Sequence, residues 1–356
     1  MVATHDIIVI GASAGGVEAI STLVAGLPRE MRAAIFVVLH VSRGKSAMPE
    51  ILTRAGCMPA AHPRDRDPIH YGRIYVAPPD HHLIIDGTSV RVVHGPTENG
   101  VRPSVDPLFR SAARTYGPRV VGVVLTGALD DGTAGLAAVK EAGGIAVVQD
   151  PEEAFAPSMP RSAMAFVNVD HVLPLREIAP LITSLTTEQT DPETRGATGP
   201  HVRPMEPDLG PATIAVDESD RPGKLSVFSC PECHGSLWES NEAGILRFRC
   251  RVGHVYSPDS MLAAQTDSVD RALWAALRAL EERAALTRRL SERAKASKRS
   301  WVSRAFADRA AAAEEHAATM REILLSRSST HTVPDHTDAG TEQPELSAPA
   351  ETPRRS

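Results

Sequence analysis

The chain has 356 residues, a formal net charge of −6 at pH 7, 42% hydrophobic residues and 23% charged residues. This length predicts roughly two or three folded units, and the acidic balance excludes a general attraction to nucleic acid or to anionic membranes. No apolar run is long enough to cross a bilayer, and the first residues lack the pattern of a secretory signal. We therefore expect a cytoplasmic protein with no membrane insertion and no nucleic-acid partner.

The first half of the chain alternates apolar runs with helical patterns. Short, nearly continuous apolar runs are typical of buried parallel strands, and they occur at 6–11, 35–40, 74–77, 120–126 and 145–149. Helical spacing occurs at 15–27, 47–55, 105–116, after Gly132 and at 178–185. A hairpin at 83–93 turns at Asp86-Gly87. Residues 1–186 are therefore predicted to form an α/β domain, with a doubly wound, mainly parallel, Rossmann-like sheet.

The second half changes in composition. Residues 187–223 are rich in Pro, Thr, Gly and acidic residues and predict a flexible linker, and the polar residues 326–356 predict a disordered tail. Between them, 224–257 holds a cysteine cluster and 258–325 predicts an α-helical region, which a weaker stretch at 295–300 divides. The apolar face of this region favours a self-packing hairpin or a dimer face. A surface for a signalling partner is the sharper alternative.

Three reactive residues stand where predicted strands end. Ser13 lies in a glycine-rich turn after the first strand, His40 ends the second strand, and Asp130 and Asp131 follow a later one. Ligands of doubly wound sheets bind beyond the carboxyl ends of the strands. A histidine can take the proton of a serine hydroxyl, and a carboxylate can hold the histidine in the required tautomer. Backbone N–H groups at the start of the following helix could stabilise an oxyanion.

A glycine-rich turn after a first strand also occurs in nucleotide-binding proteins, which is the competing interpretation. A dinucleotide fold requires an acidic residue at the end of the second strand to hold ribose, and this chain has His40 there. The chain also lacks a phosphate-binding lysine in a G-x-x-x-x-G-K-[ST] loop. The combination of residues at three strand ends therefore favours a hydrolytic site over a nucleotide site.

These segments resemble the catalytic domain of chemotaxis protein-glutamate methylesterases of the CheB type. The resemblance covers residues 5–185 and rests on IIVIGASAGGVEAI, FVVLHVS, RPSVDPLFRSAA and VVLTGALDDGTAGL. It implies a serine hydrolase in which Ser13 is the nucleophile, His40 the general base, and Asp131 rather than Asp130 the third residue. The implied reaction is hydrolysis of glutamate γ-methyl esters on the cytoplasmic helices of methylated chemoreceptors. Some members also deamidate glutamine, and catalysis needs no metal or cofactor.

The chain departs from the family pattern at several points. Ala14 stands where the family commonly has Thr, and Ala128-Leu129 where it commonly has Met-Gly. The receiver domain that usually precedes the catalytic domain is expected to be absent, which implies constitutive activity or control by another partner. Ala14 and Ala128 keep open the alternative of a catalytically degenerate scaffold or adaptor in receptor signalling.

The cysteine cluster has the spacing of a metal site. Cys230 and Cys233 form one pair, and Cys250 and His254 form a second pair beyond a short predicted hairpin. Two turns that each present a ligand pair are typical of a zinc-ribbon-like module, and three thiolates with one imidazole leave zinc no open position. We therefore predict a structural Zn²⁺ ion that stabilises the module. The isolated Cys57 is expected to be a small buried side chain.

Overall fold

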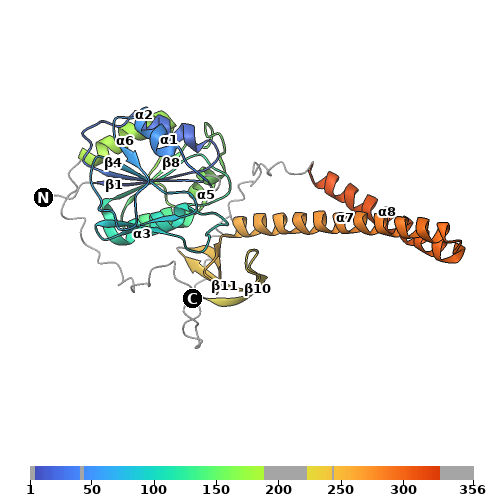
Figure 1. The fold of residues 1–356 in the computed structure, drawn as a ribbon. Coiled ribbons are helices and arrows are strands. Elements are labelled where there is room, and N and C mark those ends of the chain that lie inside the picture. Colours follow the sequence, from blue (N-terminus) through green and yellow to red (C-terminus); the bar gives the residue numbers. More distant parts are fainter. Residues whose placement is uncertain (1–4, 41–43, 188–222, 243, 329–356) are drawn as a thin grey trace, which may run out of the picture. The chain divides into compact units, whose positions relative to one another are not determined.

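The computed structural model describes residues 5–40, 44–187, 223–242 and 244–328 (Figure 1). The chain divides into two units, Met1–Asp267 and Ser268–Ser356. Nearly all of the predicted linker at 187–223 and of the predicted tail at 326–356 lies outside the described residues.

The first unit is built on a seven-stranded sheet whose neighbouring strands are all parallel, in the order β3-β4-β2-β1-β7-β8-β9. Every residue of the central strands β1 and β2 is buried, which explains why these strands read as continuous apolar runs. The strands are β1 (Ile7–Ala12), β2 (Ala34–Leu39), β3 (Ala60–Ala61), β4 (Arg73–Val76), β7 (Val120–Val124), β8 (Ile145–Gln149) and β9 (His171–Leu173).

Helices cover both faces of this sheet (Figure 1). They are α1 (Gly16–Ala25), α2 (Met48–Ala55), α3 (Val105–Tyr116), α4 (Thr133–Glu141), α5 (Ser158–Phe166) and α6 (Leu175–Thr187), with a 3-10 turn at Gly117–Arg119. α1, α2 and α6 bury apolar side chains in one hydrophobic cluster, whereas α3, α4 and α5 bury theirs in the other. The predicted doubly wound α/β fold is therefore confirmed.

The order of the strands locates the position where a ligand would bind. From β1 the chain passes to β2, then to the edge strand β3 and back to β4, which lies between β3 and β2. It then crosses to β7 on the other side of β1 and passes outward to β8 and β9. Such a reversal of direction opens a crevice beyond the carboxyl ends of the strands. The ends of β1, β2 and β7 meet at this switch point.

Some smaller features agree with the sequence and others do not. The predicted hairpin forms from β5 (His82–Asp86) and β6 (Ser89–Val93), with Gly87 at a φ of 58°. The sequence patterns missed β3, β9 and α5, because two or three residues of strand and a nine-residue helix produce little periodicity. The expectation for Cys57 was wrong: this side chain is exposed, because it lies in the turn that follows α2.

A second, antiparallel sheet follows in the same unit, in the order β10-β11-β12-β13. Its strands are β10 (Lys224–Ser229), β11 (Ser236–Glu242), β12 (Ile245–Cys250) and β13 (Val255–Tyr256). Leu237, Phe248, Tyr256 and Met261 form a small core together with two of the cysteines. We refer to residues 224–267 as the cysteine module.

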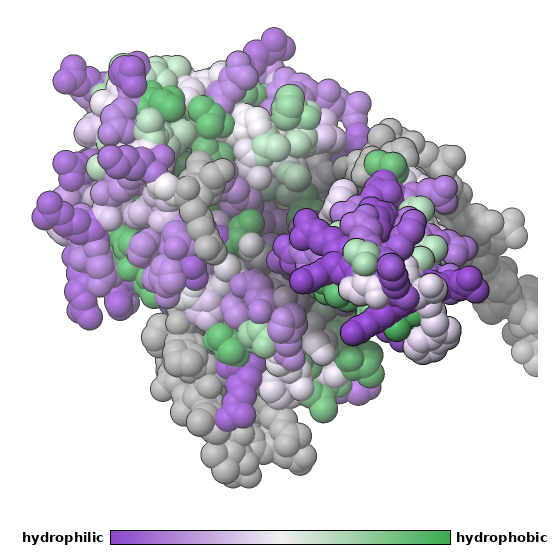
Figure 2. Space-filling model, turned by 45° about the vertical axis from the view of Figure 1, so that its right-hand side comes forward, coloured by the Kyte–Doolittle hydropathy of each residue, from purple (hydrophilic) through white to green (hydrophobic). Residues whose placement is uncertain are grey.

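The C-terminal region is helical, as predicted, with α7 (Pro258–Ala296) and α8 (Ser300–Ser328) separated inside the stretch 295–300. In the second unit Leu277 of α7 is buried with Ala317 and Leu324 of α8, so the two helices pack on each other. None of the described helices combines the length and the hydropathy that a bilayer span requires. On the face shown in Figure 2, hydrophobic residues occur in small groups among hydrophilic ones.

Candidate functional site

The structure places the three predicted catalytic residues at the ends of neighbouring strands. Ser13 follows β1, His40 follows β2, and Asp131 lies in the loop after β7. Backbone hydrogen bonds join the three strand ends: the His40 N–H donates to Ala12 at 3.2 Å, and the Ser13 N–H donates to Thr126 at 2.9 Å. The residues therefore meet at the switch point of the sheet.

His40 and Asp131 are in direct contact. The Nε2 atom of His40 lies 2.7 Å from the Oδ2 atom of Asp131, and their side chains are 16% and 3% exposed. A buried carboxylate at this distance fixes the ring and its tautomer. The neighbouring Asp130 instead accepts a hydrogen bond from Ser257 at 2.8 Å, so Asp131 is the carboxylate that meets the histidine.

The Asp131 carboxylate accepts hydrogen bonds from further donors of two segments. The Ser104 hydroxyl, the Val105 N–H and the Asn99 side-chain amide donate at 2.8, 2.7 and 2.9 Å. Burial raises the pKa of Asp131, but the hydrogen bond and charge of His40, the Val105 N–H and the Ser104 hydroxyl lower it further, so the net pKa lies well below its usual range. Asp131 is therefore an anion throughout the neutral pH range.

Ser13 lies partly exposed in a tight turn that leads into α1. Gly15 adopts a φ of 75°, a conformation that glycine takes at little cost, and it caps the helix. The Thr126 hydroxyl donates to the Ala14 carbonyl at 2.9 Å, so a neighbouring strand end holds this turn although residue 14 itself has no hydroxyl. Within the described residues no hydrogen bond joins the Ser13 hydroxyl to His40; such bonds are often long before substrate binds.

Sequence reasoning missed the residues that surround Asp131. Ser104, Val105 and Asp106 belong to RPSVDPLF, a segment that carried the family resemblance, but no role was assigned to them. Buried His82 supports this segment, because its Nδ1 atom accepts the Ser104 N–H at 3.3 Å and its Nε2 atom contacts the Pro96 carbonyl at 2.9 Å. The RPSVDPLF motif was the sequence signal that could have found these residues. The hydrogen bonds show that its residues hold the Asp131 carboxylate.

Leu129, in the loop before Asp131, has a left-handed backbone with a φ of 59°, and the residue is 41% exposed. This conformation costs a residue other than glycine about 1–2 kcal/mol. We expect Leu129→Gly to raise the free energy of unfolding by about 1 kcal/mol, because relief of strain exceeds the added entropy of the unfolded chain. Urea denaturation of both proteins measures this change, with Leu129→Ala as the control; an equal gain in the alanine variant would contradict the backbone explanation.

A second group of side chains gathers in the cysteine module: Cys230, Cys233, Cys250 and His254, whose ligand atoms all lie within 4.8 Å of one another. The Cys250 sulfur is 3.4 Å from the His254 Nδ1 atom and 3.6 Å from the Cys233 sulfur. A tetrahedral site with metal–sulfur bonds of about 2.3 Å separates its ligands by about 3.8 Å. The donor set and spacing therefore fit a metal ion, and His234 is not part of this group.

The other ring nitrogen of His254 also has a partner. Its Nε2 atom lies 3.3 Å from the Glu232 carboxylate. Metal-ligating histidines typically donate their second N–H to such a group, which fixes the tautomer. Glu232 further accepts hydrogen bonds from Tyr256, at 2.9 Å, and from Thr97. Thr97 lies two residues before Asn99, so the surroundings of the candidate metal centre extend to the segment that carries Asn99.

The fold and the site define a doubly wound α/β protein with serine, histidine and aspartate at its switch point. Residues 8–182 match the family of CheB methylesterases. A protein of Leptospira interrogans is 40% identical over 183 residues, which are 51% of this chain and 95% of that protein. It carries the provisional name protein-glutamate methylesterase/protein-glutamine glutaminase. The chain therefore belongs to the CheB methylesterase family.

Two further comparisons cover the same share of this chain. Protein-glutamate methylesterase/protein-glutamine glutaminase 2 of Anaeromyxobacter dehalogenans is 39% identical over 182 residues, and the match spans 51% of this chain and 53% of that protein. The crystal structure of the CheB methylesterase catalytic domain of Thermotoga maritima is 31% identical, with a TM-score of 0.49, and the match covers 51% of this chain and 98% of that one. The matches thus concern about half of the chain.

Proposed function

We propose that residues 1–186 form a serine hydrolase that removes γ-methyl esters from glutamates of chemoreceptor helices in the cytoplasm. The observation that carries the proposal is the buried His40–Asp131 pair, with a 2.7 Å contact, beside Ser13 at the switch point. Membership in the CheB methylesterase family supports the ester chemistry. The names of the relatives support glutamate esters as substrates and glutamine deamidation as a second activity.

In this mechanism Ser13 attacks the ester carbonyl while His40 takes the hydroxyl proton. Asp131 stabilises the resulting imidazolium, which then gives its proton to the methoxide as methanol leaves. Water enters, loses a proton to His40 and cleaves the acyl-enzyme, which restores Ser13 and yields glutamate. Backbone N–H groups at the start of α1 would bind the oxyanion, apart from that of Gly16, which donates to the Ser13 carbonyl at 2.8 Å.

We further propose that Cys230, Cys233, Cys250 and His254 hold a structural zinc ion. Their three sulfur atoms and one nitrogen suit zinc and leave no position for substrate. The ion would stabilise a module whose own apolar core is small, and it takes no part in ester hydrolysis.

The test of the esterase is methanol release from methyl-esterified receptor fragments, with ammonia release from the glutamine forms measured in parallel. The control is the same protein after treatment with an organophosphorus reagent that phosphorylates reactive serines, followed by mass spectrometry of the Ser13 peptide. We expect methanol release that stops when Ser13 is modified. A folded, zinc-loaded protein that releases no methanol and leaves Ser13 unmodified would favour the scaffold alternative.

A further inference from the structure

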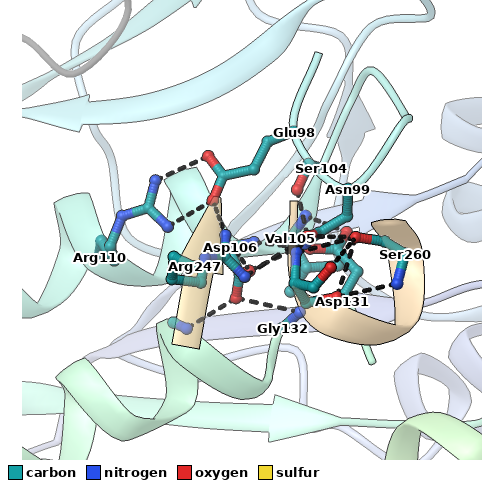
Figure 3. A network of polar contacts seen from close by, with 12 residues as sticks. Glu98, Asn99, Ser104, Val105, Asp106, Arg110, Asp131, Gly132, Arg247 and Ser260 are labelled. Carbon is teal, nitrogen blue, oxygen red and sulfur yellow. Dashed lines mark hydrogen bonds and ion pairs between the residues drawn. The ribbon is translucent and has the colours of Figure 1, made fainter. Parts of the chain in front are cut away.

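One buried arginine of the cysteine module contacts the residues beside the candidate active site. Arg247, on β12, is 2% exposed, and its guanidinium pairs with Glu98 and, at 3.1 Å, with Asp106 (Figure 3). The Glu98 carboxylate also accepts hydrogen bonds from both terminal nitrogens of the Arg110 guanidinium, at 2.7 and 2.8 Å. A buried charge left without its partner is strongly destabilising, so Arg247 and the two acids are interdependent.

Asp106 connects this ion pair to the loop of Asp131. Its Oδ1 atom accepts the N–H groups of Gly132 and Gly135 at 3.1 and 2.7 Å. Burial raises the pKa of Asp106 to about 7, and the positive charge of Arg247 opposes that rise. Arg247 therefore favours the carboxylate form of Asp106. This form accepts the hydrogen bonds that fix Gly132, the residue after Asp131.

Asn99 makes the direct connection to the proposed triad. Its side-chain nitrogen donates to Asp131 at 2.9 Å and to Asp106 at 3.0 Å. Its side-chain oxygen faces donors of the cysteine module: the Ser257 N–H at 3.2 Å, the Ser260 hydroxyl at 3.3 Å and Arg247 at 3.4 Å. Because donors surround the oxygen and acceptors surround the nitrogen, the amide has one favourable orientation.

The module holds these donors rigidly. Ser257 and Ser260 form a reciprocal cap at the start of α7, in which each backbone N–H donates to the other hydroxyl, at 2.9 and 3.0 Å. The main chain adds to this, because the Asn99 N–H donates to the Val255 carbonyl at 2.7 Å and the Val255 N–H donates to Thr97 at 3.3 Å. Asn99 thus lies in a backbone segment that pairs with β13.

We propose that the cysteine module is a positioning element of the esterase, in which Arg247 acts through Asn99 to hold Asp131 against His40. The proposal rests on the proposed function of Ser13, His40 and Asp131. It differs from an autoinhibitory cover, because Ser13 remains partly exposed and the His40 side chain is 16% exposed with the module in place. Arg247 and Asn99 are positioning residues and touch no substrate.

The first experiment compares the full chain with Arg247→Met, Arg247→Lys and, as a matched control, Arg251→Met, which changes an exposed arginine of the same module. We expect Arg247→Met to lower kcat by about 10- to 100-fold with KM within about twofold, because the defect lies in the orientation of the triad. Arg247→Lys recovers part of the loss, and Arg251→Met matches wild type. A folded Arg247→Met protein with wild-type kcat would overturn the proposal.

A double-mutant cycle tests the route through Asn99. Asn99→Ala removes the connection but leaves the pairs of Arg247 with Glu98 and Asp106, so this variant also covers the case in which Arg247→Met fails to fold. If Arg247 acts through Asn99, adding Arg247→Met to Asn99→Ala lowers kcat much less than it does in wild type. Two independent, multiplicative losses would contradict this route.

A nuclear magnetic resonance readout separates this proposal from the proposed function. The low-field N–H proton that His40 shares with Asp131 reports their hydrogen bond without any substrate. We expect this signal to shift or broaden in Arg247→Met and in Asn99→Ala, and to stay unchanged in Arg251→Met. A perturbed signal in a chain that hydrolyses no ester would reject the esterase and keep the positioning role, whereas an unperturbed signal would reject the positioning role.

Discussion

Replacing Ser13 by alanine is expected to reduce methanol release from methylated receptor fragments by about 10⁴-fold or more. The alanine leaves His40 and Asp131 in contact but removes the atom that forms the acyl-enzyme, so only residual stabilisation by binding and by the oxyanion donors remains. Ser13 is partly exposed and the turn is held by backbone bonds and by Thr126, so the variant should fold like wild type. Single-turnover methanol assays measure the loss.

Asp131→Asn provides the companion measurement. The amide keeps the size of the side chain but cannot stabilise an imidazolium, and a loss of about 10⁴-fold in kcat is expected. The neighbouring Asp130→Asn is the matched control, because Asp130 contacts Ser257 rather than His40. A wild-type rate in Ser13→Ala, or equal losses in the two aspartate variants, would remove the basis for the assigned roles.

Removal of the metal is expected to unfold the cysteine module. The core of the module is small, whereas binding of a structural zinc ion in comparable modules contributes about 10–16 kcal/mol at neutral pH. A chelator under reducing conditions, or the variant Cys250→Ala, should therefore abolish metal binding and expose Trp238, which is half-buried on β11. Tryptophan fluorescence, circular dichroism and metal analysis of the purified chain measure these changes.

The chain offers matched controls for this experiment. Cys57 is exposed and stands apart from the cluster, and His234 lies one residue after a ligand without belonging to the group. Cys57→Ala and His234→Ala should therefore retain one metal ion per chain, and Cys250→Ala and His254→Ala should lose it. Retention of stoichiometric metal by Cys250→Ala would exclude the four-residue site.

Much of the fold could be predicted because its signals are local. Strands buried on both faces leave continuous apolar runs, as β1 and β2 do, and helices on their surface leave a periodic pattern. The placing of Ser13, His40 and Asp131 at one edge followed from the parallel arrangement, since carboxyl ends of parallel strands meet. The cysteine spacing was informative because it too is a local signal: each ligand pair lies within one turn.

The contacts around Asp131 could not be predicted, because they join distant segments. The hydropathy of β12 alone would bury Leu246 and expose Arg247, but Leu246 is 40% exposed and Arg247 is 2% exposed. The inversion has a cause that only tertiary structure supplies, namely two carboxylates, Glu98 and Asp106, on the facing segment. Nothing periodic in the sequence marks an arginine whose partners lie elsewhere in the chain.

The separation of these partners also orders events during synthesis. Ser260 contacts Asn99 across 161 residues, so the last donors to the amide leave the ribosome well after the strands that carry Ser13, His40 and Asp131. At about 5–20 residues per second, the 161 residues between Asn99 and Ser260 take roughly 8–32 s to synthesise. If the cysteine module positions the triad, a nascent or truncated chain that ends before residue 260 holds every reacting group yet is a poor esterase. Full activity would then mark a chain that has been translated through its cysteine module.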